Sequence, residues 1–309
     1  ILLPTPFQTF EKYCNIRRLT QRIMRLLVHF HIYYLQHVDY FLDMMKNINS
    51  VRWDLFVTSP HIDEATENKI KEFKPDARIE HVPNEGYDIW PFIYMVKSIC
   101  LEDYDCILKL HTKGPLPFAA HLNGIVFRDF MWRDALVEAL IGSPETFRSN
   151  MDIFSEHPDV GMVFSDKLYI KADFREDGRA LIKELKRLSF RTCHRRFCAG
   201  TMFMIRPQAL RYLTSDLVCE DMFNKPLKSH SNGSMSHIYE RIFTLATLAQ
   251  GYKVHTVGVP MTYKAFFRVN RWVKPVLSFL FSIERRGAQM KKYLTILGIR
   301  IKLDDGVRV

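Results

Sequence analysis

Apolar runs of strand length alternate with helical segments over the first third of the chain, and this alternation constrains the fold most. The runs that predict strands are 26–34, 53–59, 77–82 and 104–111. The segments with helical periodicity between them are 38–48, 63–73 and 91–99. Four strands joined by three helices predict right-handed crossovers between parallel strands. The sequence therefore predicts an α/β domain with a mostly parallel central sheet.

The pattern changes after residue 111. Segment 113–124 contains two prolines and two glycines and predicts a loop at the carboxyl end of the fourth strand, where α/β sheets place their ligands. Beyond it we expect helices, strands and polar connections in alternation. The helices are 128–141, 145–156 and 235–250, the strands 160–164, 197–205 and 252–257, and the polar connections 166–196 and 218–234.

Composition excludes several classes of protein. With 47% hydrophobic and 13% aromatic residues, the 309-residue chain is too apolar to be disordered. Its apolar stretches are shorter than the roughly 18–20 residues that cross a bilayer. Six cysteines are too few for a disulfide scaffold, and the first residues lack the features of a secretory signal. We therefore expect a cytoplasmic protein with reduced thiols.

Positive charge gathers near the end of the chain. Segment 268–302 holds nine basic residues and one acidic residue, so it carries +8 of the total charge of +10. We expect three parts: an amphipathic lead (1–25), the main domain (26–267) and a basic, partly apolar tail taken as helical (268–309). Trp272, Phe279 and Phe281 among the cations favour peripheral docking of the tail on the anionic inner face of the cytoplasmic membrane.

Four strings in a fixed order carry more specific information. They are VHFHIYY (28–34), NEGYDIWPF (84–92), YDCILKLHTK (104–113), and CAGTMFMIRPQAL (198–210) followed by HIYERIF (237–243). Together they resemble the rhamnan synthesis F family of bacterial glycosyltransferases, whose members look like GT-A-fold enzymes. The resemblance implies a nucleotide-diphosphate sugar as donor, with dTDP-rhamnose a candidate. It also implies inverting transfer to a growing glycan or lipid-linked acceptor.

The resemblance implies a donor site at the strand ends and the loops that follow them. The candidate donor-binding residues are His29, His31, Thr58, Ser59, Asn84, Gly86, Asp88, His111 and Lys113. Gly86 allows close backbone approach, and the Asp88 carboxylate can accept hydrogen bonds from sugar hydroxyls, with an ordinary helix cap as the alternative. The family pattern resembles NRGRD, so Glu85 and Tyr87 replace two arginines. Lys113 can then supply positive charge for phosphate.

The strand before Lys113 bears on the need for a metal. GT-A enzymes commonly carry Asp-x-Asp there, which binds a divalent cation, whereas this strand ends His111-Thr112-Lys113. No metal ligand is therefore assigned and no cofactor is required. Binding of Mg²⁺ or Mn²⁺ through Asp103 or Asp105 stays an open alternative.

Later residues are candidates for acceptor binding and catalysis. The acceptor-binding candidates are Trp132, Arg133, Ala199, Gly200 and Thr201. His237 and Glu240 are three positions apart on one helix and share a face, so either can act as a general base on an acceptor hydroxyl. Glu240 is preferred. The Glu220-Asp221 pair is the rival for this role, and structural pairing of Glu240 with Arg241 is the alternative without catalysis.

Three other functions are alternatives to the transfer of rhamnose. Transfer of a different hexose or deoxyhexose is the nearest alternative. A non-enzymatic nucleic-acid or membrane binder would use the basic tail, but no motif that reads nucleic acid accompanies the charge, so no nucleic-acid partner is expected. A histidine-dependent metallohydrolase needs a complete ligand set, which His29 and His31 do not provide.

Overall fold

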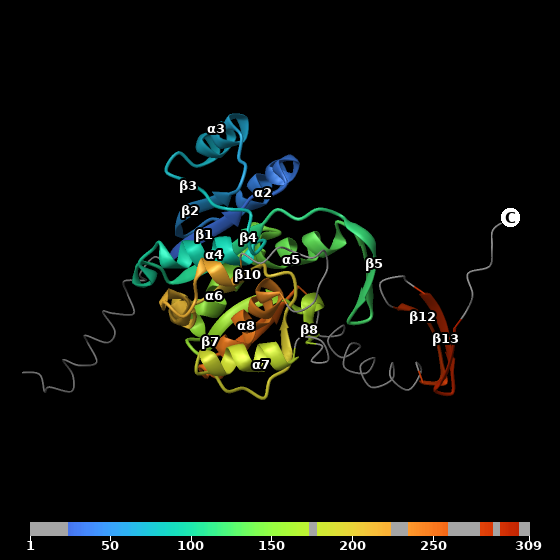
Figure 1. Ribbon diagram of the computed structural model, residues 1–309. Helices are drawn as coiled ribbons and strands as arrows, with labels where there is room; N and C mark the ends of the chain where they lie inside the picture. The colour runs from blue at the N-terminus through green and yellow to red at the C-terminus, as the bar shows by residue number, and fades with distance from the viewer. Residues whose placement is uncertain (1–23, 173–177, 224–233, 259–278, 287–290, 303–309) are drawn as a thin grey trace, which may run out of the picture.

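A seven-stranded sheet with the order β11-β7-β10-β4-β1-β2-β3 forms the centre of the molecule (Figure 1). The computed structural model describes residues 24–172, 178–223, 234–258, 279–286 and 291–302. The strands are β1 (Arg25–His31), β2 (Arg52–Ser59), β3 (Arg78–His81), β4 (Cys106–His111), β7 (Val160–Ser165), β10 (Phe203–Ile205) and β11 (Lys253–Val257). Only β10 pairs antiparallel with its neighbours in this sheet. The predicted α/β class with a mostly parallel sheet is confirmed.

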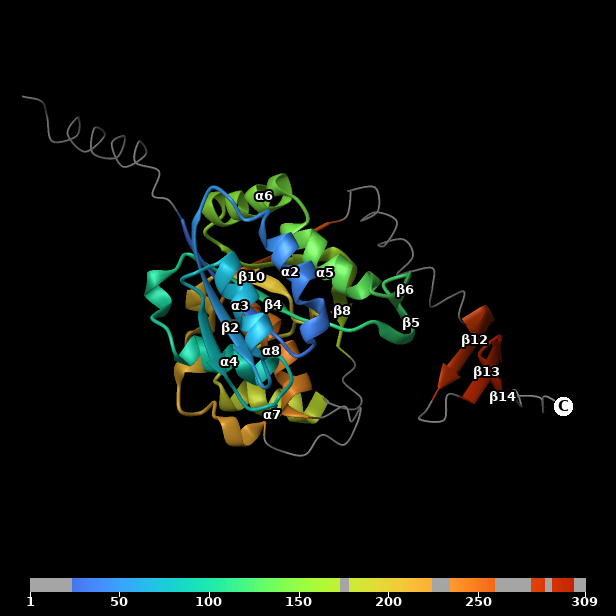
Figure 2. The same ribbon diagram turned by 90° about the horizontal axis from the view of Figure 1, so that it is seen from above.

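Helices cover both faces of the sheet (Figures 1 and 2). One apolar core contains side chains of α2 (Val38–Met45), α3 (Glu64–Phe73), α5 (Met131–Ile141) and α6 (Pro144–Glu156). The other contains side chains of α4 (Ile89–Lys97), α7 (Gly178–Arg187) and α8 (Met235–Ala249). Short 3₁₀ turns are η1 (Leu35–His37), η2 (Leu101–Asp103), η3 (Asp166–Leu168), η4 (Pro207–Thr214) and η5 (Glu220–Met222). No described helix is long and apolar enough to cross a membrane.

The alternation of side chains along the strands determines which face carries polar groups. In β1, Val28 and Phe30 enter the core beneath α2 and α5, whereas Leu27 enters the core beneath α4 and α8. Strand periodicity of two then places His29 and His31 on the α4 and α8 face. The polar residues of β1 therefore lie on one face, within an otherwise apolar core.

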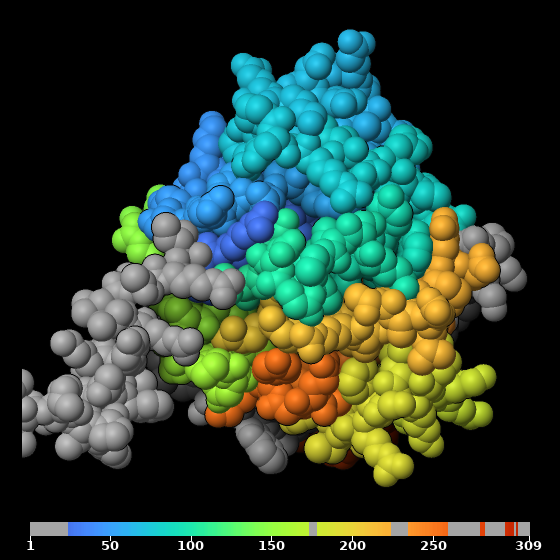
Figure 3. Space-filling model, turned by 90° about the vertical axis from the view of Figure 1, so that its left-hand side faces the viewer, coloured from blue at the N-terminus to red at the C-terminus, as the bar shows by residue number. Residues whose placement is uncertain are grey.

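The packing of η4 closes this second core from the side. Segment η4 contacts both α4 and α8. It appears in Figure 3 as part of the gold band next to the teal surface that includes α4. Ala209, Leu210 and Leu213 of η4 are buried in the same core.

The predicted loop 113–124 is instead largely a hairpin. Strands β5 (Leu116–Leu122) and β6 (Ile125–Asp129) pair antiparallel around the two-residue turn Asn123-Gly124. Both turn residues have positive φ, 50° and 82°, which a tight hairpin requires and which Asn-Gly adopts readily. The prediction of a loop is wrong because Asn123-Gly124, a sequence typical of tight hairpin turns, lets the chain reverse and pair with itself. Because β6 extends to Asp129, helix α5 begins at Met131, three residues later than predicted.

The predicted strand 197–205 is divided in two. β9 (Arg196–Cys198) pairs with β8 (Tyr169–Lys171), and β10 joins the central sheet. Gly200 and Thr201 between them have φ of 86° and 50°, which no strand accommodates. The polar connection predicted at 166–196 also contains α7, whose apolar side includes the buried Leu181 and Leu185.

The prediction of a helical tail is wrong for its described strands. β12 (Phe281–Arg286), β13 (Lys291–Ile296) and β14 (Ile299–Lys302) form an antiparallel sheet. Leu297-Gly298 makes the turn between the last two strands with φ of 49° and 78°. Alternating apolar and polar residues around this turn favour strands over a helix. Most of the predicted lead (1–25), and Trp272 of the tail, lie outside the described residues.

Candidate active site

Polar side chains of three parallel strands meet at the carboxyl edge of the sheet. The backbone register places His31 beside Thr58 of β2 on one side and His111 of β4 on the other. The Thr58 hydroxyl lies 3.0 Å from His29 Nε2 and 3.0 Å from His31 Nδ1. This hydroxyl can donate to one ring and accept from the other. His29, His31 and Thr58, three of the predicted donor residues, therefore form a buried hydrogen-bonded unit.

Asp88 lies where the loop after β3 meets this edge. It occupies the N-cap position of α4, but its side chain makes no hydrogen bond that caps the helix. Its Oδ2 instead lies 2.5 Å from Lys109 Nζ and 3.4 Å from His111 Nδ1, and it accepts a hydrogen bond from the Thr201 hydroxyl. The cap alternative is therefore wrong, because the carboxylate joins the site.

Lys109 places an ammonium group inside the protein. It lies in the middle of β4, is 0% exposed, and also donates to the backbone oxygen and the hydroxyl of Thr201, at 3.0 and 3.2 Å. Asp88 and Thr201 thus share one cation, which links the loop after β3 to the turn before β10. Sequence reasoning did not select Lys109. The available signal was a single charged residue within the buried apolar run CILKLH.

The charge states of these groups follow from burial and pairing. Burial alone would raise the pKa of Asp88, but His111, Lys109 and the Thr201 hydroxyl together lower it, so the carboxylate is ionised. Burial lowers the pKa of Lys109, and the Asp88 charge opposes that shift. Burial also lowers the pKa of His29 and His111, and that of His31 to about 4. These imidazoles are therefore neutral at pH 7.

Glu240 approaches the same turn from α8. Its Oε1 accepts a hydrogen bond from the Gly200 backbone N–H at 2.8 Å. Burial raises its pKa, although the Gly200 N–H and the nearby Arg241 oppose this. Arg241 Nη1 is 4.0 Å from Glu240 Oε2 and donates a hydrogen bond to the backbone oxygen of His237. A carboxylate with a raised pKa is a stronger base than an ordinary one.

The other predicted catalytic residue lies at the start of α8. His237 Nδ1 is 2.8 Å from the Oγ of Ser234, the N-cap residue. The centroid of its ring is 6.3 Å from that of Tyr87. Tyr87 is the loop residue between Gly86 and Asp88 in the sequence. The rival pair Glu220-Asp221 is in η5, where Asp221 is exposed.

Two glycines allow the loops to approach their neighbours. Gly86 has φ +66°, and a Cβ there would lie 2.8 Å from the Cβ of Trp90. Gly200 has φ +86°, and a Cβ there would lie 2.6 Å from Trp132 Nε1. The structure therefore places Trp132 directly against the turn that holds Thr201. Lys113 Nζ lies 5.4 Å from the Trp132 ring centroid, so the predicted phosphate ligand joins this group.

Four remaining candidates make other contacts. Arg133 stacks on the rings of Tyr40 and Phe130, at 3.7 and 4.2 Å, and pairs with Asp134, so its guanidinium takes part in packing. Ser59 is fully buried, and its hydroxyl accepts from the backbone N–H of His61. The remaining two are Asn84, which is exposed, and Ala199, which is buried next to Gly200 in the sequence.

The comparison with a protein-family model decides the family. The model of rhamnan synthesis protein F matches residues 6–252, most of the chain. The chain belongs to the rhamnan synthesis protein F family. The resemblance seen in the four sequence strings is therefore confirmed.

Curated relatives of this rhamnan synthesis F chain include the uncharacterized protein WxcX from two strains of Xanthomonas campestris pv. campestris. Each is 28% identical over 187 residues, which make up 59% of this chain and 25% of WxcX. The matched segment thus spans about a quarter of the length of these curated relatives.

Solved structures with partial similarity include a mannosyltransferase, TarS and a synthase. The mannosyltransferase PcManGT from Pyrobaculum calidifontis, in complex with GDP-Man and Mn²⁺, has 14% identity and a TM-score of 0.40, covering 88% of this chain and 70% of its own. S. aureus TarS 1-349 has 10% identity and a TM-score of 0.41, with 83% and 66% covered. Glucosyl-3-phosphoglycerate synthase from Mycobacterium tuberculosis has 10% identity and a TM-score of 0.35, with 90% of each chain covered.

The described side chains at the carboxyl edge of the sheet in this rhamnan synthesis F chain do not gather a set of metal ligands. Asp105 comes just before β4 and accepts a hydrogen bond from the Arg25 N–H, so it and Asp103 lie at the amino end of the strand, away from His111. The Asp88 carboxylate is bound by an ammonium group. In the described part of the chain, no cluster of three or more His, Cys, Asp or Glu could hold a metal. Asp103 and Asp105 therefore lie at the opposite end of β4 from the candidate site, and use of a divalent cation stays a prediction.

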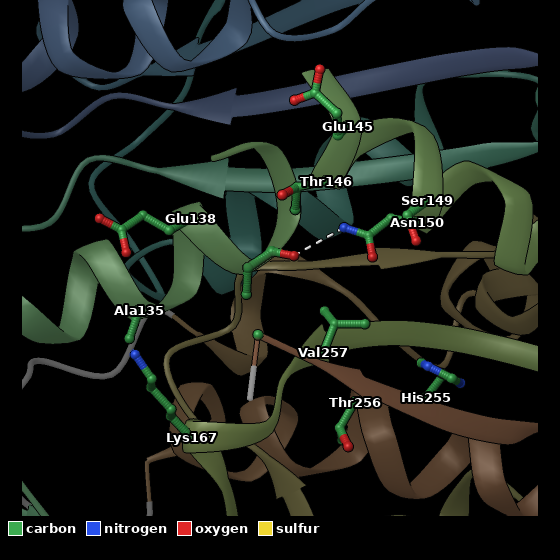
Figure 4. Close-up of a pocket in the computed structure, with 12 residues that line it drawn as sticks. Ala135, Glu138, Glu145, Thr146, Ser149, Asn150, Lys167, His255, Thr256 and Val257 are labelled. Carbon is green, nitrogen blue, oxygen red and sulfur yellow. Dashed lines mark hydrogen bonds between the residues drawn. The ribbon is translucent and has the colours of Figure 1, made fainter. Parts of the chain in front are cut away.

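A separate cavity of about 590 Å³ lies between α5, α6 and β11 (Figure 4). Its lining includes Glu138, Glu145, Lys167 and His255. Neither Asp88, Lys109 nor Glu240 lines it. The chemistry described above therefore belongs to the sheet edge and not to this cavity.

Proposed function

We propose that this chain is a glycosyltransferase that moves a sugar from a nucleotide-diphosphate donor to a hydroxyl group of a growing glycan. The observation that carries the proposal is the contact network around Lys109, which joins Asp88 of the predicted donor loop to Thr201. The adjoining Gly200 contacts the predicted base Glu240. Family membership supports the same reaction. The ionised carboxylate of Asp88 and the half-buried carboxylate of Glu240 thus approach one turn from two sides.

The residues suggest a division of roles. Asp88 accepts hydrogen bonds from donor hydroxyls, and Lys113 provides positive charge for the diphosphate. Glu240 takes the proton of the acceptor hydroxyl, whose oxygen forms a bond to the anomeric carbon. The bond from that carbon to the diphosphate oxygen breaks, and the nucleoside diphosphate leaves with the electron pair. Attack opposite the leaving group inverts the anomeric centre. No step in this scheme depends on a metal.

The finer parts of the proposal concern the substrates. We propose a deoxyhexose such as rhamnose as the transferred sugar, with dTDP-rhamnose as the first donor to test. The support is membership in the rhamnan synthesis F family. The proposed acceptor is a surface glycan under construction, carried on a lipid.

A donor panel tests the proposal. The chain is mixed in turn with dTDP-rhamnose, GDP-mannose, UDP-glucose and UDP-N-acetylglucosamine, and its Tm is measured. A donor at about 100 times its Kd stabilises the folded state by about 2.7 kcal/mol. We expect one donor to raise the Tm, Asp88→Asn to lose that rise, and Asp103→Asn at the opposite end of β4 to keep it.

Each variant is compared with its own unliganded Tm, because Asp88→Asn also removes the partner of Lys109. If no nucleotide sugar raises the Tm, the proposed function is wrong. If Asp88→Asn keeps the full rise, the donor binds elsewhere.

A further inference from the structure

The C-terminal sheet has one apolar face. Antiparallel register pairs Phe281 with Ile296 and Ile296 with Ile299, and it pairs Leu294 with Ile301. Directly opposed residues share a face of the sheet, and residues two apart on a strand share it too. These five side chains therefore lie on the same face across all three strands.

This apolar face is exposed to solvent. Ile299 is 69% exposed, Phe281 59%, Ile301 48% and Ile296 41%. Single exposed apolar residues are common, but a continuous patch across three strands indicates an interaction surface. Isolated small sheets also gain stability when their apolar face is covered.

The charge of the segment indicates what covers the face. Residues 279–302 contain six basic residues and one acidic residue, a net charge of +5. Two pairs in register consist of basic residues, Arg285 with Lys292 and Arg286 with Lys291, and both lie toward the end of the sheet away from Phe281. A second copy of this sheet would bring like charges together, whereas an anionic surface attracts them.

We propose that this apolar face docks onto an anionic lipid bilayer. The isoleucine and phenylalanine side chains enter the interfacial region, and the net positive charge of the segment attracts it to anionic headgroups. The proposal refines the expectation of a membrane-docking tail by placing the contact on one face of a sheet. It rests on the sheet alone and is independent of the proposed sugar transfer.

Vesicle cosedimentation of the full chain tests the proposal. Vesicles of phosphatidylcholine alone are compared with vesicles that also contain phosphatidylglycerol. The test variants are Ile299→Thr and Ile301→Thr, because threonine keeps the β-branched shape that suits a strand. The matched control is Ile182→Thr, an equally exposed isoleucine (47%) on α7.

We expect the wild-type chain to bind the anionic vesicles and to be released by salt. Each variant in the sheet should weaken binding about tenfold, and Ile182→Thr should not change it. Equal binding by all variants, or binding to neither kind of vesicle, overturns the proposal. Dimerisation of the wild-type chain that Ile299→Thr abolishes also overturns it, because the face would then bind a second copy. Circular dichroism of each variant shows whether its strands remain.

Discussion

At the scale of single residues, Lys109 brings a charge into the interior of β4, and its acceptors lie on two different loops. An ammonium group without exposure is stable only when its hydrogen bonds and counter-charge are complete. Asp88 supplies the counter-charge and Thr201 the other acceptors. The position of both loops therefore depends on a side chain that points away from solvent.

Replacing Lys109 with methionine should leave the half-buried Asp88 carboxylate without its counter-charge. We expect Lys109→Met to lower the free energy of unfolding by about 3–5 kcal/mol, the usual effect of removing one member of a buried pair. The double variant Lys109→Met with Asp88→Asn should recover at least about 1 kcal/mol, because no unpaired charge remains. Urea denaturation of the single and double variants measures both effects. Equal stability of Lys109→Met and wild type would show that the pair does not support the fold.

The sequence motifs indicate most residues of the candidate site but not the hydrogen bonds that connect them. Asp88, His111, Gly200 and Glu240 were selected from motifs, and the structure brings them to one edge. Lys109 was passed over because strand patterns mark buried positions as apolar, and its partners are 21 and 92 positions away in the sequence. Arg133 is a candidate because it resembles a family position, but its guanidinium stacks on Tyr40 of α2 and on Phe130 at the start of its own helix.

At the scale of elements, the turn between β9 and β10 connects Trp132 on α5 with Glu240 on α8. Gly200 has both a positive φ and a side chain packed against it, so two separate constraints require glycine there. Gly251 at the end of α8 has nearly the same φ, +88°, but nothing lies within 4 Å of the position of its Cβ. A side chain at position 251 would therefore meet only backbone strain, whereas one at position 200 would meet both backbone strain and a steric clash.

Substituting alanine at these two glycines tests the role of the turn. Both variants should lose about 1–2 kcal/mol of stability, since each places a Cβ in the left-handed region. Only Gly200→Ala should also displace Trp132 and lower transfer activity, and we expect at least a tenfold loss of kcat/KM. Thermal unfolding and steady-state kinetics measure the two effects. Similar activity in both variants would mean that the contact with Trp132 does not shape the site.

Element boundaries were predicted well where hydrophobic periodicity was strong. Helix α8 and strands β1, β2 and β7 agree with the sequence to within a few residues. Two of the errors fall at residues with positive φ: Asn123-Gly124 turns a predicted loop into a hairpin, and Gly200-Thr201 divides a predicted strand. Periodicity does not register a reversal made by two residues, so these features require turn chemistry.

At the scale of the whole molecule, buried neutral histidines make stability depend on pH. The pKa values of His29, His31 and His111 are lowered in the folded state, so the unfolded chain binds their protons more readily. Stability is therefore full above the unfolded histidine pKa of about 6.5 and falls as the pH drops below it. The lowered pKa of Asp88 adds a further loss below about pH 4.

We expect the free energy of unfolding to fall by up to about 1.4 kcal/mol per pH unit for each histidine between pH 6.5 and 5. Urea denaturation over this range measures the slope. His31→Gln should make the slope shallower, because it removes the contribution of one histidine. A free energy of unfolding that stays constant from pH 7 to 5 would show that the imidazoles are accessible to protons in the folded chain.

In the proposed reaction, Glu240 acts on the acceptor while Asp88 binds the donor, both within one site. The most direct measurement is transfer by Glu240→Gln, with donor affinity determined in parallel. We expect kcat to fall about 10²–10⁴-fold, the usual contribution of a general base, with the donor Kd unchanged. His237→Ala should lower kcat less, and thermal unfolding should exclude a loss of folded protein. Full transfer by Glu240→Gln together with loss of transfer by Asp221→Asn would contradict the account and assign the base to η5.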